Sequence, residues 1–208
     1  MTPLRIRQRV QTLLAAYQRA QLWRRTRDAF TPPPLAAYAN FGARSIVIPP
    51  ARVESPDCIA VGEGVVVHEH AWLCVQRREG LPPPHLSIGD GTSINRFSKI
   101  VCHGRVTIGN GVVMGDRVYI SDVHHEVVPN GRPGLSDPRP VVIGDNAFVG
   151  VGAVVKPGVT LGEGSYVAAA AVVYEDVPAH TLVVGDPARA VRRRSASGEW
   201  ERVNETTG

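Results

Sequence analysis

Residues 142–177, VIGDNAFVGVGAVVKPGVTLGEGSYVAAAAVVYEDV, repeat with a period of six. Every sixth residue from Ile143 is aliphatic, and the residue four places after each of them is small or β-branched. The first set is Ile143, Val149, Val155, Leu161, Val167 and Val173, and the second is Ala147, Ala153, Val159, Ser165, Ala171 and Val177. This period fits neither a helix, with about 3.6 residues per turn, nor the alternation of a sandwich strand. It is typical of a parallel β-helix.

The physical basis of the repeat is a triangular coil made of three hexapeptides, about 18 residues in all. The aliphatic residue fills the interior, and the small residue occupies the turn, where a large side chain would not fit. Coils stack at the strand spacing of about 4.8 Å, so backbone groups pair with the coils on either side. No coil buries its interior alone, which makes the stack the stable unit.

The same register continues towards the N-terminus, with interruptions. Its aliphatic positions are Val53, Val61, Val67, Leu73, Ile88, Ile94, Ile100, Ile108, Met114 and Ile120. We predict that the β-helix begins near Ile46 or Ile48, within a domain over 41–194. Residues 77–84 form a loop, and a longer excursion occupies about 123–140; such loops are often functional. The polar tail, 195–208, is expected to be loosely held.

An α-helix is predicted over 4–29, within an N-terminal segment covering 1–40, because apolar residues recur there at helical spacing. The helix is rich in arginine, and two interpretations stay open. It packs against this β-helix or a neighbouring subunit, or it lies weakly on an anionic membrane surface.

Composition narrows the functional classes. The chain has 208 residues, a net charge of +4 and three cysteines without metal-like or disulfide spacing. It lacks an apolar stretch of about 18 residues and a secretory signal, so we expect a cytoplasmic protein, at the inner face of the membrane if the basic helix binds lipid. No zinc-finger or RNA-recognition signature occurs, so no nucleic-acid partner is predicted.

Residues 141–191, VVIGDNAFVGVGAVVKPGVTLGEGSYVAAAAVVYEDVPAHTLVVGDPARAV, resemble the hexapeptide-repeat acyltransferases, nearest the branch of galactoside, maltose and envelope-polysaccharide sugar O-acetyltransferases. The resemblance runs from about Ile46 to Arg194. It implies a left-handed parallel β-helix, acetyl-CoA as co-substrate, a sugar or glycoconjugate acceptor, and a homotrimer with sites between subunits. Direct acetyl transfer to a hydroxyl in a ternary complex is then expected. The alternatives are N-acylation of an amino sugar and a non-catalytic scaffold.

The resemblance also implies a catalytic histidine. In the galactoside acetyltransferase pattern this residue lies seventeen places after the aliphatic of VTIG and five after the last aliphatic of its coil. Counting from Ile108 and from Ile120 gives His125 in both cases, with His124 as the alternative. An imidazole suits a general base because its ordinary pKa lies near neutral pH.

Two polar residues accompany the predicted base. Asp122 could orient the His125 ring by accepting a hydrogen bond from Nδ1, or it could bond the backbone of its own turn. Asn95 matches the family's active-site asparagine, thirteen places before the VTIG aliphatic; otherwise it is a corner residue in a left-handed conformation, which asparagine tolerates.

The predicted cofactor groove is a face of small residues. Gly150 and Ala168 are eighteen residues apart, as are Val151 and Ala169, so each pair stacks in consecutive coils. The resemblance places the pantetheine arm of coenzyme A on this face, with Phe148 as a ring wall. Arg189 would meet the nucleotide phosphates or belong to a solvated basic tail.

A metal site is not predicted. His68, His70, His85 and His103 invite comparison with the gamma carbonic anhydrases, which resemble this fold and bind zinc through three histidines. That class carries a His-x4-His pair, and this chain has none.

Overall fold

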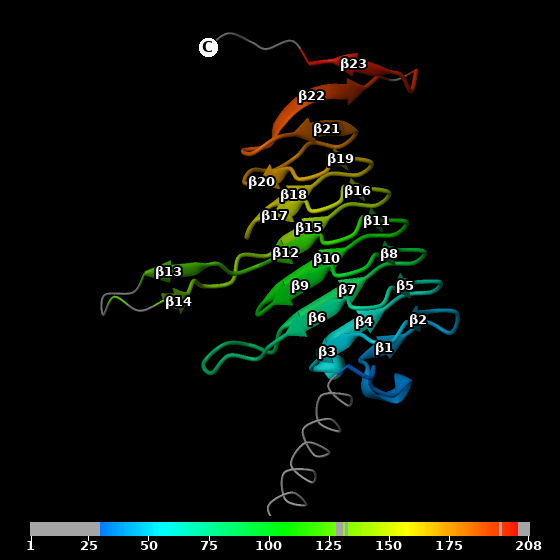
Figure 1. Ribbon diagram of the computed structural model, residues 1–208, viewed down its shortest axis with the longest axis vertical. Coiled ribbons are helices and arrows are strands. Elements are labelled where there is room, and N and C mark those ends of the chain that lie inside the picture. The colour runs from blue at the N-terminus through cyan, green and yellow to red at the C-terminus, as the bar shows by residue number, and fades with distance from the viewer. Residues whose placement is uncertain (1–29, 128–130, 132, 196, 204–208) are drawn as a thin grey trace, which may run out of the picture.

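The computed structural model of the protein describes residues 30–127, 131, 133–195 and 197–203. Short strands wind into successive coils of a parallel β-helix, and the three sides of the coils form three sheets (Figure 1). The helix predicted over 4–29 lies outside the described residues. Within them, no helix is long and apolar enough to cross a membrane.

Each sheet collects one strand from every coil. The first sheet contains β1 (Asn40–Phe41), β4 (Ile59–Val61), β7 (His85–Ile88), β10 (Arg105–Ile108), β15 (Val141–Ile143) and β18 (Thr160–Leu161). The second contains β2 (Ile46–Val47), β5 (Val66–Val67), β8 (Ser93–Ile94), β11 (Val113–Met114), β16 (Phe148–Val149), β19 (Tyr166–Val167), β21 (Thr181–Val184), β22 (Arg189–Arg194) and β23 (Trp200–Arg202). The third contains β3 (Arg52–Glu54), β6 (Trp72–Val75), β9 (Lys99–Cys102), β12 (Tyr119–Ser121), β17 (Val154–Val155) and β20 (Val172–Val173). Two 3-10 turns, η1 (Leu35–Ala37) and η2 (Pro56–Cys58), lie near the N-terminal end of the described chain.

The hexapeptide register is confirmed by the strand pairing. Ile108 pairs with Ile143, and Ile143 pairs with Leu161, so the interior of the first sheet is one aliphatic column. Met114, Val149 and Val167 form the matching column of the second sheet. These residues are buried, as are the small residues at the turns. The parallel pairing is consistent with the left-handed β-helix that the resemblance implies.

The predicted beginning of the β-helix is wrong by a short distance. The first paired strand is β1, which begins at Asn40. In β2 the inward residue is Val47, which pairs with Val67 and packs against the core, whereas Ile46 is 51% exposed. Because side chains alternate along a strand, a shift of one residue moves the apolar side chain from the interior to the surface.

Two segments form more strand than expected. The long excursion contains an antiparallel hairpin, β13 (His125–Val127) with β14 (Pro133–Leu135), which projects sideways from the stack (Figure 1). At the C-terminal end, β22 turns back along β21, and β23 pairs with β22. Part of the tail expected to be loosely held therefore continues the second sheet.

Candidate active site

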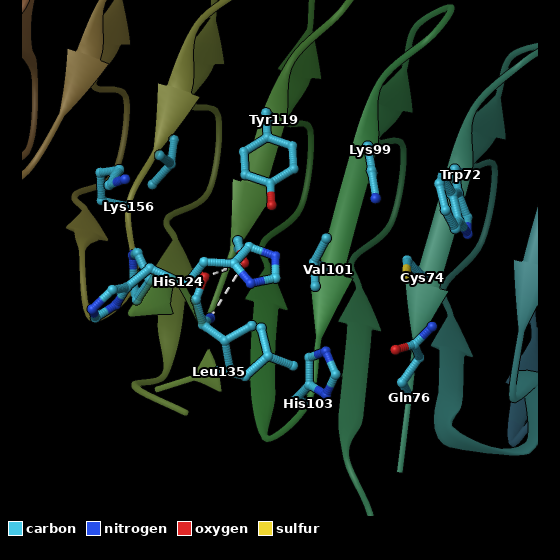
Figure 2. Close-up of a pocket in the computed structure, with 15 residues that line it drawn as sticks. Trp72, Cys74, Gln76, Lys99, Val101, His103, Tyr119, His124, Leu135 and Lys156 are labelled. Atoms are coloured by element: carbon cyan, nitrogen blue, oxygen red, sulfur yellow. Dashed lines mark hydrogen bonds between the residues drawn. The ribbon is translucent and has the colours of Figure 1, made fainter. Parts of the chain in front are cut away.

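An open pocket of about 360 Å³ lies on the outer face of the third sheet, beside the hairpin (Figure 2). Side chains alternate along each strand, so every second residue of β6, β9 and β12 points out of the triangular stack of coils, called the prism below. Trp72, Lys99 and Tyr119 are paired in register across these strands and form one row. The described residues that line the pocket are Trp72, Cys74, Gln76, Lys99, Val101, His103, Tyr119, Ser121, Val123, His124, His125, Leu135, Val155, Lys156 and Pro157.

The structure brings both candidate bases to this pocket. His125 is exposed and pairs with Leu135 across the hairpin, whereas His124 is half-buried. Two hydrogen bonds between His124 and Ser136 hold the hairpin base: the Ser136 backbone N–H donates to the His124 oxygen at 2.9 Å, and the His124 backbone N–H donates to Ser136 Oγ at 3.1 Å. Arg78, in the loop before β7, donates to the carbonyl oxygen of Ser136 at 2.7 Å. The histidines are therefore fixed to the prism at the pocket mouth.

Asp122 serves the backbone rather than the His125 ring. Its carboxylate is fully buried and accepts hydrogen bonds from the backbone N–H groups of His103, Gly104 and Arg105, with distances of 2.7–3.1 Å. The ring-orienting role predicted for it is thus not the contact that the structure shows. The second predicted role, a bond to the backbone of its own turn, also differs from the structure. The turn that Asp122 binds, His103–Arg105, belongs to the preceding coil.

Asn95 lies away from the histidines, at the corner where the chain leaves a strand of the second sheet and enters one of the third. It follows Ile94 as Gly150 follows Val149 and Ala168 follows Val167, and the pairing of these strands puts the three residues in one column. Ser93 Oγ donates to Asn95 Oδ1 at 3.2 Å. The left-handed residue of this turn is Phe97, with a φ of 60°, and Asn95 is not one of the described residues with positive φ. The corner-conformation alternative for Asn95 is therefore wrong.

The small-residue face predicted for the cofactor exists at this same corner. A Cβ on Gly150 would come within 2.5 Å of the Ala169 nitrogen, so only glycine fits beneath the next coil. The backbone N–H of Ala170 donates to the Val151 oxygen at 2.8 Å. Val151 is 48% exposed and Ala169 is also exposed, so both side chains face outward.

Phe148 and Arg189 border this corner. The Phe148 ring stacks on Tyr166, with centroids 4.3 Å apart, on the outer face of the second sheet. Arg189 begins β22 and pairs with Val184, directly above the Ala168 column, and its side chain is exposed. None of Asn95, Gly150 and Ala168 is among the described residues that line the histidine pocket. Within one chain, the candidate base and the candidate groove therefore lie at opposite ends of the third-sheet strands.

Several residues of the pocket have no signal in the sequence. Trp72 and Lys99 occupy outward positions of strands that were recognised only by their inward residues, and Lys156 directly follows β17. His103 is 4% exposed and its Nδ1 has no hydrogen-bond partner in the described part of the chain. Burial lowers the pKa of His103, so its ring is neutral at neutral pH.

The one cysteine among the described residues that line the pocket, Cys74, is not activated as a nucleophile. Burial, and secondarily the charge of Glu54, raises the pKa of Cys74 to about 11, so its thiol stays protonated at neutral pH. Residues 30–127 and 133–195 contain no cluster of three histidine, cysteine, aspartate or glutamate side chains placed to hold a metal ion.

Comparison with known proteins agrees with this architecture. A family model described as the hexapeptide repeat of succinyl-transferase matches residues 140–175. Galactoside O-acetyltransferase of Escherichia coli is 32% identical over 153 residues, which are 69% of this chain and 70% of the relative. A candidate acetyltransferase of Schizosaccharomyces pombe is 43% identical over 89 residues, 42% of this chain, and there the chain spans only 43% of the relative's length.

Among solved structures, a hexapeptide-repeat-containing acetyltransferase of Vibrio cholerae O1 biovar eltor, in complex with acetyl coenzyme A, is 27% identical with a TM-score of 0.53. The match covers 76% of this chain and 73% of that protein. The repeat register, the stacked parallel strands and these relatives lead to one conclusion: the chain belongs to the hexapeptide-repeat acyltransferases.

Proposed function

We propose that this protein is an acetyl-CoA-dependent O-acetyltransferase that moves an acetyl group to a sugar hydroxyl. The observation that carries the proposal is His125, which is held by an anchored hairpin at the mouth of a pocket with aromatic and polar walls. The similarity to a galactoside O-acetyltransferase supports the class of acceptor.

In the proposed reaction His125 acts as the general base. It takes the proton of the acceptor hydroxyl as that oxygen attacks the thioester carbonyl carbon, and the carbon–sulfur bond breaks after the new carbon–oxygen bond forms. The imidazolium then returns the proton to the departing thiolate of coenzyme A. The acetyl group passes directly to the acceptor, and no bond to the protein forms.

The acetyl donor would occupy the corner face of Gly150, Val151, Ala168 and Ala169. That face suits an extended pantetheine arm because exposed small side chains leave backbone groups within reach. Arg189, at the top of the same column, would meet the nucleotide phosphates. Asn95, at the lower end of the column, would contact the thioester or the acceptor.

Because base and groove lie at opposite ends of the third-sheet strands, we propose a homotrimer in which His125 of one chain faces the groove of the next. Exposed apolar side chains near the groove, Val113, Val151 and Tyr166, support an interface there. Cyclic symmetry closes such an interface without leaving a free edge.

The substitution His125→Ala tests the proposed base. We expect turnover to fall by about 10²–10⁴-fold, the usual contribution of a general base, while binding of coenzyme A measured by calorimetry stays nearly unchanged. His124→Ala is the matched control and should lose much less activity. A larger loss in His124→Ala would assign the base to His124 instead, and full activity of both variants would contradict a histidine base. Mass spectrometry of glycans from cells with and without the gene identifies the acceptor.

A further inference from the structure

The pocket beside the hairpin carries positive charge. The proposed acetyl transfer to a hydroxyl does not by itself require this charge. The chain has only two lysines, Lys99 and Lys156, and both line this pocket. No aspartate or glutamate is among its described lining residues. Neither lysine forms an ion pair with a carboxylate of the described chain.

The lysines lie against aromatic rings instead. The Nζ atom of Lys99 is 3.7 Å from the centroid of the Trp72 ring, and the Nζ atom of Lys156 is 5.7 Å from that of Tyr174. A ring face orients an ammonium group without neutralising its charge. The charges of both lysines therefore stay available to a ligand.

Two acidic groups beside the pocket, Glu54 and Asp122, already have partners. Glu54 is 2.7 Å from an Nη of Arg52 and accepts hydrogen bonds from Gln76 Nε2 at 2.8 Å and from Trp72 Nε1 at 3.2 Å. Asp122 is buried beneath the pocket and accepts the backbone N–H groups described above. Arg78, which holds the hairpin, adds a further positive charge nearby.

The remaining lining suits a sugar ring. The ring of Tyr119, on the strand next to Lys99, is exposed and offers an apolar face to the C–H face of a sugar (Figure 2). The Trp72 ring, on the other side of Lys99, already carries Lys99 and Arg52 over it, with the Cζ atom of Arg52 4.3 Å from the ring centroid. His103 supplies a buried neutral imidazole whose Nδ1 lacks a partner among the described residues.

We infer that the acceptor is an acidic saccharide, whose carboxylate or phosphate group binds between Lys99 and Lys156 while its ring lies against Tyr119. This inference rests on the proposed acetyl transfer, because it assigns the acceptor of that same site. A neutral sugar would leave two unpaired ammonium groups beside it, whereas an anion makes charge-assisted hydrogen bonds to them.

Three probes of matched ring structure test the inference: methyl β-glucoside, methyl β-glucuronide and methyl β-glucoside 6-phosphate. With acetyl-CoA saturating, we expect at least one charged probe to show a KM about ten times lower than that of the neutral glucoside. Preference for the glucuronide would identify a carboxylate, and preference for the 6-phosphate would identify a phosphate. Equal KM values for all three probes would overturn the inference.

Lysine variants show whether the preference comes from this pocket. Lys99→Gln and Lys156→Gln should each reduce the preference for the charged probe by about three-fold, and the double variant should abolish it, whereas Lys99→Arg should largely retain it. Arg44→Gln, which removes an exposed charge elsewhere on the prism, should leave the preference unchanged. If the glutamine variants instead raise the KM of acetyl-CoA and keep the preference, the lysines bind the cofactor and the inference is wrong.

A direct binding measurement distinguishes a failure of this inference from a failure of the proposed reaction. Saturation-transfer NMR with the same probes needs no turnover. Lysine-dependent binding of a charged probe without acetyl transfer would contradict the reaction but support an acidic ligand. Acetyl transfer to the neutral glucoside, without lysine-dependent binding of either charged probe, would support the reaction and overturn the acidic acceptor.

Discussion

Asp122 shows at the scale of one residue how the β-helix supports the long excursion that leaves it. Its side chain holds the turn at His103–Arg105, and its carbonyl oxygen accepts the backbone N–H of Arg139 at 2.8 Å. Arg139 lies where the chain returns from the hairpin to the next coil. One buried residue therefore fixes both the turn below the pocket and the end of the excursion that carries His125.

The substitution Asp122→Ala should accordingly destabilise the fold. It leaves three backbone N–H groups without their acceptor, so we expect the free energy of unfolding to fall by on the order of 3 kcal/mol or more. Urea denaturation measures the change. Asp116→Ala is the matched control, because Asp116 accepts only one exposed backbone N–H, that of Arg96 at 3.2 Å, and should cost less than about 1 kcal/mol. Equal effects of the two variants would contradict the anchoring role.

Because His103 is buried, we expect the fold to lose stability in acid. Burial lowers its pKa in the folded state, with the charge of Arg78 adding to the effect and those of Asp122 and Glu54 opposing it. Below the ordinary pKa of about 6.5 the unfolded chain binds a proton that the folded chain does not, so stability falls as pH decreases. We expect the drop in Tm between pH 7 and pH 5 to be smaller in His103→Gln than in the unchanged protein. Identical drops would exclude His103 as a source.

The roles of these residues stayed open at the level of sequence, because neighbours along the chain are easier to recognise there than neighbours in adjacent coils. Asp122 was compared with His125, three residues away, although the pairing of β12 with β9 places it beside Cys102, where the turn that it binds begins. Counting one coil of eighteen residues had paired Gly150 with Ala168 correctly. Lys99 was missed, and His103 was weighed only as a metal ligand, because both occupy outward positions, which carry no periodic signal.

At the scale of elements, the repeat was readable from sequence and its interruptions were not. Inward aliphatic residues fixed the register of most strands, since each must fill the same interior column. The hairpin β13–β14 and the strands β22 and β23 depend on contacts that no period encodes, such as Arg78 donating to Ser136 and the antiparallel pairing of β22 with β21.

The corner face offers a test at this scale. Ala169→Trp should block the proposed groove without unfolding the protein, because the side chain of Ala169 is exposed. We expect coenzyme A affinity, measured by calorimetry, to fall at least about ten-fold while Tm changes little. Ala43→Trp is the control, because Ala43 holds the same repeat position at another corner and is equally exposed. Normal affinity in Ala169→Trp would rule out this groove.

At the scale of the whole molecule, the separation of base and groove predicts that the site needs two chains. Light scattering should give the mass of a trimer, and a monomer at micromolar concentration would contradict the assembly. The decisive measurement co-expresses the two inactive variants, His125→Ala and Ala169→Trp. If neighbouring chains share each site, roughly a quarter of the sites in randomly mixed trimers combine an intact His125 with an intact groove, and that share of the activity should return. Trimers of either variant alone are the controls. No recovery in purified mixed trimers would place the whole site within one chain.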